Sequence, residues 1–247
     1  MKLSFMQFKR KPIHGVSAAA VLIHILTGLI FLCTLIIYAF SAEARAIWAA
    51  VSAIVLAQLP ILLIKWCRTI PPAVWILWDI FLLSSILCGE ILDFYTRFSI
   101  WDLGVHFLSG FLFAVIGAVP VYRLQPSTGI IPAASAFSLS LSSSLLWEFT
   151  EFACDRLFGA DMQRDTLMPI VSTRLLGSNA EITRIRIDSI TVNGAPWPGY
   201  IDIGLVDTMT DLLAGAAGAS VFFLLALLIP HSSGCRTVFE ALVPEKR

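Results

Sequence analysis

The stretch Val16–Phe40, VSAAAVLIHILTGLIFLCTLIIYAF, contains 25 residues and no Asp, Glu, Lys or Arg. A helix needs about 20 mostly apolar residues to cross the hydrocarbon core of a bilayer. Lys9, Arg10 and Lys11 precede the stretch and small residues around Ala42 follow it, as in a signal peptide. The apolar run is well beyond the roughly 7–15 residues of a signal-peptide core, so we expect a retained membrane anchor.

The composition of the whole chain indicates the same environment. Hydrophobic residues make up 57% of its 247 residues, charged residues 14%, and the mean hydropathy is +0.84. Soluble domains have about 45–50% apolar and about 25% charged residues, so the excess apolar surface is expected to face lipid. A net charge of zero gives no basic surface for nucleic acid. The five cysteines follow no CxxC pattern, which favours free thiols over a disulfide framework.

Further apolar stretches of similar length predict an all-α integral membrane protein with a bundle of about six transmembrane helices. We expect the spans at about Val16–Phe40, Ala46–Ile64, Ala73–Leu92, Leu103–Tyr122, Ile130–Phe152 and Val206–Leu228. The chain is interpreted as one polytopic domain, 1–247, with the polar stretch 153–205 as an extracytoplasmic loop between the fifth and sixth spans. This stretch is too long for a simple connector.

Basic residues in the short loops predict the orientation, because cytoplasmic loops are enriched in Lys and Arg. With an even number of spans, most of these residues fall on one side, and both termini are therefore expected in the cytoplasm. The basic residues on the cytoplasmic side are Lys2, Lys9, Arg10, Lys11, Lys65, Arg68, Arg123, Arg236, Lys246 and Arg247. In the outer loop, Glu181–Val192 alternates apolar and polar residues and ends at Asn193-Gly194, which predicts a short hairpin or an irregular cap.

Acidic residues of four predicted spans fall at the same, outer end of the bundle. Ionisable side chains are costly inside a membrane, so their convergence calls for a physical reason. The group consists of Glu90, Asp93, Asp102, His106, Glu148, Glu151, Asp155, Asp207 and Asp211.

Three pairs within this group have a spacing of three or four residues, which puts both members on one helix face. The pairs are Asp102 with His106, Glu148 with Glu151, and Asp207 with Asp211. Carboxylate and imidazole ligands on facing helices suit a divalent metal such as Zn²⁺, Mn²⁺ or Fe²⁺. We predict these six residues as metal ligands, with Glu148 and Glu151 also as catalytic residues.

A bound metal is one of several ways to compensate the negative charge of this group. Shared protons, or arginines such as Arg97 and Arg156, would also neutralise the acidic group. Acids at helix starts, Asp102 and Asp207 among them, cap the helix and complement its dipole. Asp79, near the cytoplasmic half of the third span, fits either a proton or ion contact or an interfacial hydrogen bond. We interpret His24 in the first span as a packed, hydrogen-bonded histidine.

Small residues in the fourth and sixth spans predict close helix packing. Gly215 and Ala219 form a small-xxx-small pair directly after Asp211, and Gly110 and Gly117 lie in the fourth span. Such residues let helix backbones approach each other closely in a membrane.

Three segments, in chain order, resemble motifs of the YjdF-type bacterial inner-membrane proteins. Trp101–Gly110 resembles their Asp-x-x-x-His-Phe-x-x-Gly segment, Trp147–Phe152 their Trp-Glu-x-x-Glu segment, and Val206–Gly215 their Asp-Thr-x-x-Asp segment. VanZ-like proteins show a fainter similarity. The resemblance implies a bacterial inner-membrane location and the same residue set, but it names no reaction. The chain departs from the family pattern by a longer loop before Asp207, where the family has a short Gly-Thr-x-Gly-Asp stretch.

The acidic group supports three hypotheses of function. The first is a divalent-metal site for hydrolytic or transfer chemistry on a lipid or headgroup substrate, with the loop as a lid. The second is a proton- or cation-coupled transporter, in which Asp79 continues the path inward. The third is a non-catalytic membrane scaffold whose outer loop binds a partner.

Overall fold

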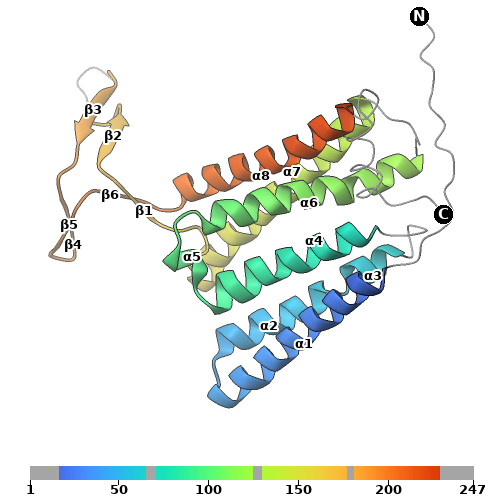
Figure 1. Cartoon of the computed structure of the whole chain (residues 1–247). Helices are drawn as coiled ribbons and strands as arrows, with labels where there is room; N and C mark the ends of the chain where they lie inside the picture. The colour runs from blue at the N-terminus through green and yellow to red at the C-terminus, as the bar shows by residue number, and fades with distance from the viewer. Residues whose placement is uncertain (1–16, 65–70, 125–129, 177–180, 229–247) are drawn as a thin grey trace, which may run out of the picture. The chain divides into compact units, whose positions relative to one another are not determined.

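The computed structural model describes residues 17–64, 71–124, 130–176 and 181–228. In these ranges six helical segments are long and apolar enough to cross a membrane, which confirms the all-α membrane fold (Figure 1). They are Ala18–Ser41, Ala44–Leu62, Pro72–Ile91, Trp101–Ala118, Ile130–Phe158 and Leu205–Leu228. Most of the basic residues that predict the orientation lie outside the described ranges.

The chain divides into two compact units. The first contains Met1–Ser144 and Leu212–Arg247, and the second contains Leu145–Asp211. Helices α7 (Ile130–Phe158) and α8 (Leu205–Leu228) each run without interruption from one unit into the other.

Helix α1 (Ala18–Ser41) opens the first unit and shows why the chain is so apolar. The Ser17 hydroxyl caps its start by accepting a hydrogen bond from the Ala20 amide at 3.2 Å. The helix ends at Ala42, whose φ of 56° lies in the left-handed region. Leu22 and Ile37 are more than half exposed on its surface. Lipid, rather than a protein core, is the solvent that such side chains favour.

The second span consists of two helices, α2 (Ala44–Leu56) and α3 (Leu59–Ile64), where the sequence predicted one continuous segment. Pro60 explains the break, because it has no amide to donate to the carbonyl of Leu56 four residues earlier. The indole Nε1 of Trp78 donates to that carbonyl instead, at 3.0 Å. This hydrogen bond joins the third span to the second.

The third span also changes its helix type. Helix α4 (Pro72–Leu82) starts with Pro72 in its first turn, and it continues as the π-helix η1 (Leu83–Ile91). The chain turns at Asp93, whose φ is 57°, into the short helix α5 (Phe94–Arg97). The Trp101 indole donates to the Ser84 carbonyl at 3.1 Å, which connects the π-helix to the start of α6 (Trp101–Leu124).

Glycines allow α6 and the second half of α8 to approach each other closely, as the small residues predicted. A β-carbon at Gly110 would collide with the backbone of Gly215, and one at Gly218 would collide with the Phe107 carbonyl. The Ser140 hydroxyl of α7 donates to the Gly110 carbonyl at 2.7 Å. The three helices therefore pack through backbone contacts as well as side chains.

Two apolar cores fill the first unit. One includes Val115, Ala118, Ala219 and Phe222, and it packs α6, α7 and α8 together with Trp75 of α4. The other includes Phe31, Trp78, Leu82 and Leu112, and it packs α1, α2, α4 and α6.

The second unit contains three antiparallel two-stranded ladders between its two helical segments (Figure 1). The pairs are β1 (Thr166–Met168) with β6 (Tyr200–Asp202), β2 (Ile170–Thr173) with β3 (Thr183–Arg186), and β4 (Ile190–Val192) with β5 (Ala195–Trp197).

The hairpin predicted at Asn193-Gly194 is confirmed. It joins β4 to β5 through two left-handed residues, with φ of 51° at Asn193 and 85° at Gly194. Asn-Gly favours this type of two-residue turn because both residues tolerate a positive φ. The alternating stretch 181–192 forms two separate strands, β3 and β4, which pair with different partners.

The close approach of α6 and α8 gives a first test. Gly110→Ala places a methyl group against the Gly215 backbone, and we expect a loss of about 1–3 kcal/mol of stability, as in an overpacked core. Thermal unfolding of the detergent-solubilised chain measures the effect. Gly104→Ala on the same helix is the matched control, because nothing lies within 4 Å of its β-carbon. Equal melting temperatures of the two variants would contradict the packing role of Gly110.

Candidate functional site

Glu148, Glu151 and Asp211 form a buried group of carboxylates in the second unit. Their exposed fractions are 3%, 7% and 2%. Each offers a carboxylate oxygen, and these oxygens all lie within 4.8 Å of one another. Helix α7 supplies Glu148 and Glu151 from one face, as their spacing predicted, and α8 supplies Asp211.

Trp147 positions one of these carboxylates. Its indole Nε1 donates a hydrogen bond of 2.7 Å to Oε1 of Glu151, one turn further along α7. Hydrogen bonds from neighbouring groups orient metal-ligating side chains in many proteins. The sequence alone assigned this tryptophan no role beyond its place in the Trp147–Phe152 segment, although its four-residue spacing from Glu151 is the signal for the contact.

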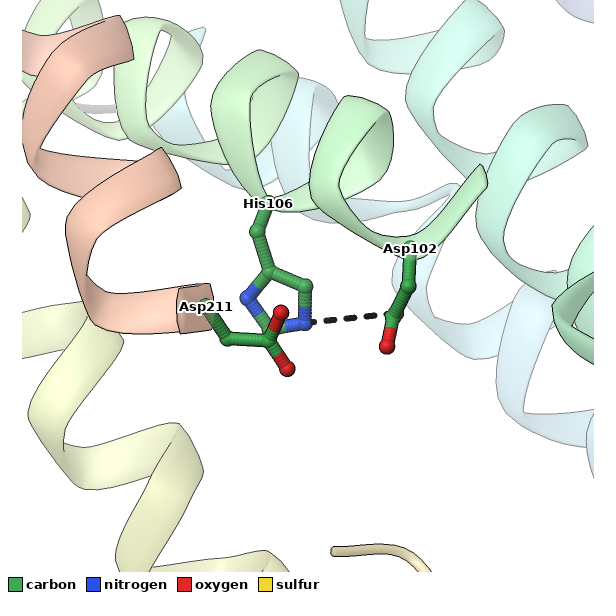
Figure 2. Close-up of side chains that lie close together, drawn as sticks. All are labelled: Asp102, His106 and Asp211. Atoms are coloured by element: carbon green, nitrogen blue, oxygen red, sulfur yellow. Dashed lines mark ion pairs between the residues drawn. The ribbon is translucent and has the colours of Figure 1, made fainter. Parts of the chain in front are cut away.

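Asp102 and His106 form a second ionisable pair, in the first unit. Nε2 of His106 lies 3.6 Å from Oδ1 of Asp102, and Asp102 is 8% exposed. Figure 2 shows both side chains on the same side of α6. Asp102 occupies the first turn of α6, where the helix dipole favours a negative charge. The four-residue spacing predicted this pairing.

Asp207 contacts the backbone of the segment that follows α7. Its Oδ2 accepts a hydrogen bond of 3.1 Å from the Arg164 amide, and the next residue, Thr208, accepts one of 2.6 Å from the Gln163 side chain. Among the described residues, Asp207 is not in a group of three whose ligand atoms lie close together. Its position therefore differs from that of Asp211, one turn later on α8.

Asp155 has a structural role in the same segment. Its carboxylate accepts hydrogen bonds from the amides of Met162 at 2.7 Å and Gln163 at 2.9 Å. Nearby, the pKa of Asp161 is raised, first by loss of hydration and then by the negative charges of Asp165 and Asp155.

Glu90 and Asp93 are paired with an arginine at the surface of the first unit. Arg45 lies 2.8 Å from Asp93 and 3.7 Å from Glu90, and both acidic side chains are about 40% exposed. Arg97 and Arg156 were the arginines expected to neutralise the acidic group, and Arg45 was not predicted. The guanidinium of Arg156 lies over the Phe152 ring at 5.3 Å.

His24 and Asp79, which the sequence analysis treated separately, contact each other. Nδ1 of His24 lies 2.9 Å from Oδ1 of Asp79, across the interface of α1 and α4. Their similar distance from the starts of their helices is a signal that the sequence contained. The rotation of the two helices, which decides the contact, is not readable from a single sequence.

These observations define a polytopic integral membrane protein with ionisable groups buried among its helices. The family model described as "predicted membrane protein (DUF2238)" matches residues 23–232. The chain belongs to this family. No curated protein and no solved structure shows a significant match to the chain.

The hydrogen bonds of Asp155 give a prediction for the segment after α7. Asp155→Ala removes an acceptor from two amides, and hydrogen bonds to a charged group are worth about 1.5–3 kcal/mol each. We expect limited proteolysis to cleave the segment 159–165 faster in this variant. Asp188→Asn, at an exposed residue of the loop, is the control and should leave the cleavage rate unchanged. An unchanged rate in Asp155→Ala would show that these hydrogen bonds do not hold the segment.

Proposed function

We propose that Glu148, Glu151 and Asp211 bind a divalent transition metal. The observation that carries this proposal is the burial of three carboxylates whose oxygens lie within 4.8 Å of one another. Negative charges this close, removed from water, repel strongly unless a cation or protons compensate them. Carboxylate oxygens together with imidazole suit Zn²⁺, Mn²⁺ or Fe²⁺.

Asp102 and His106 complete the ligand set in this proposal. Their four-residue spacing supports it, because it puts a carboxylate and an imidazole on one face of α6. Asp207, one turn before Asp211, is the sixth proposed ligand.

The proposed reaction is hydrolysis or group transfer on a lipid or lipid-headgroup substrate. A bound metal lowers the pKa of a coordinated water and polarises a phosphoryl or carbonyl oxygen. Glu148 or Glu151 would act as the general base. The loop 153–205 would cover the substrate as a lid. The three motifs shared with YjdF-type proteins support a bacterial inner-membrane location, and the basic short loops support cytoplasmic termini.

Metal content tests the site directly. We expect the purified full-length chain to contain about one or two equivalents of a transition metal, measured by mass spectrometry, and Glu148→Gln to lose most of it. Glu90→Gln is the matched control, since Glu90 is an exposed acid paired with Arg45. A folded wild-type chain that stays without metal after incubation with Zn²⁺, Mn²⁺ and Fe²⁺ in turn would contradict the proposal.

His106→Ala separates the two parts of the ligand set. If His106 is a ligand, this variant binds the metal more weakly than the wild type, and full retention would limit the site to the three carboxylates. Phosphate release from vesicles that contain a lipid phosphomonoester then tests the reaction. Loss of a general base lowers such a rate by about 10²–10⁴-fold, so Glu148→Gln should be inactive even at saturating metal.

The contact of Trp147 with Glu151 gives a finer prediction. Trp147→Phe keeps an aromatic ring but removes the hydrogen bond that orients the carboxylate. Loss of such a supporting contact typically costs about 10–100-fold in metal affinity. Competition with a chelator measures the change, and Trp48→Phe, at a tryptophan that is 70% exposed, is the control. Equal affinities would show that Trp147 does not position a ligand.

A further inference from the structure

Three polar side chains meet inside the first unit, away from the carboxylate group. His24 comes from α1, and Trp75 and Asp79 come from one face of α4, four residues apart. Asp79 is fully buried and Trp75 is 5% exposed. The His24 ring lies edge-on to the Trp75 ring, with centroids 5.0 Å apart, and its Nδ1 lies 2.9 Å from Asp79.

Two polar atoms of this trio have no hydrogen-bond partner within the described part of the chain. Oδ1 of Asp79 contacts His24, whereas Oδ2 of Asp79 and Nε1 of Trp75 are buried and unsatisfied. One atom is an acceptor and the other is a donor. A water molecule that bridged the two atoms would satisfy both, by accepting from the indole and donating to the carboxylate, and buried waters typically make about three such bonds.

Charge favours one proton on the pair. Consider one proton that either the His24 imidazole or the Asp79 carboxylate holds. If the imidazole holds it, imidazolium faces carboxylate; if the carboxylate holds it, both groups are neutral. In both states the pair has no net charge. Losing a proton leaves a negative charge in a membrane span, and gaining another leaves a positive one.

The charged side chains that the structure describes on the neighbouring helices are distant along those helices. The described charged side chains of α2, η1 and α6 are Arg45, Glu90, Asp102 and His106. They lie near the helix ends that are farther from His24 and Asp79. The halves of α7 and α8 in this unit contain no charged residue. Among the described side chains of these helices, Cys33 and Tyr38 of α1 and Cys88 of η1 are the other titratable groups, and they lie toward that same end.

We propose that His24, Trp75 and Asp79 form an internal proton-binding site. One proton is shared by Nδ1 of His24 and Oδ1 of Asp79 near neutral pH. In acid, the carboxylate takes a second proton from hydronium at its unsatisfied Oδ2, which releases water and leaves imidazolium beside a neutral carboxylic acid. His24 and Asp79 lie six and seven residues after the first residues of α1 and α4, about 10 Å along each helix. The starts of α1 and α4 are therefore the nearer helix ends for proton entry.

Infrared difference spectroscopy of the full-length chain in lipid tests this site. Between pH 8 and pH 4 we expect, among the carbonyl bands of the chain's carboxylic acids, one band from Asp79 that changes in intensity and shifts in deuterium oxide. Asp79→Asn should abolish this band, whereas Asp188→Asn should keep it. His24→Gln should move the midpoint of the transition by at least about one pH unit, because it removes the group that shares the proton.

Trp75→Phe tests the water separately. It removes only the indole donor, so the band should remain and its deuterium shift should become slower or smaller. A band that is unaffected by Asp79→Asn, or no Asp79-dependent change over this pH range, would overturn the proposal. If Asp79→Asn does not fold, the His24→Gln variant tests the proposal instead. An unchanged midpoint of the pH transition in that variant would refute the shared proton. None of these readouts depends on a bound metal, so the metal site and the proton site fail or stand independently.

Discussion

The cost of an unpaired charge inside a membrane governs how this chain folds. The outer faces of its spans are apolar, and α1 exposes Leu22 and Ile37 where a soluble helix would carry polar residues. Ionisable side chains within the helices instead meet one another: His24 meets Asp79, and His106 meets Asp102. Backbone groups follow the same rule, since the Leu56 carbonyl that Pro60 leaves without a donor receives one from Trp78.

The six spans could be predicted because length and hydropathy alone decide membrane insertion. The break in the second span had a local signal, Pro60, but a proline in a membrane helix predicts a kink less reliably than in a soluble one. The π-helix Leu83–Ile91 had no such local signal in the sequence. Its register depends on contacts such as the one between Trp101 and Ser84, which join residues far apart in sequence.

In the candidate site, too, contacts within one helix could be predicted from the sequence and contacts between helices could not. Contacts within one helix follow from spacing, so the faces formed by Asp102 with His106 and by Glu148 with Glu151 could be read from the sequence. Contacts between helices depend on how each helix is rotated about its axis. The pairing of Arg45 with Asp93 is of this kind.

An apolar layer separates the two polar regions of the first unit. Phe31 follows His24 by about two turns of α1, Leu82 follows Asp79 by about one turn of α4, and both belong to one buried core together with Leu112 of α6. Each of the three side chains is fully buried and offers no hydrogen-bonding group. Protons move along chains of hydrogen bonds, and none of these three side chains can take part in such a chain between the His24–Asp79 pair and the Asp102–His106 pair. The π-helix directly follows Leu82 of this layer, and π-helical segments inside α-helices are frequently found at functional sites.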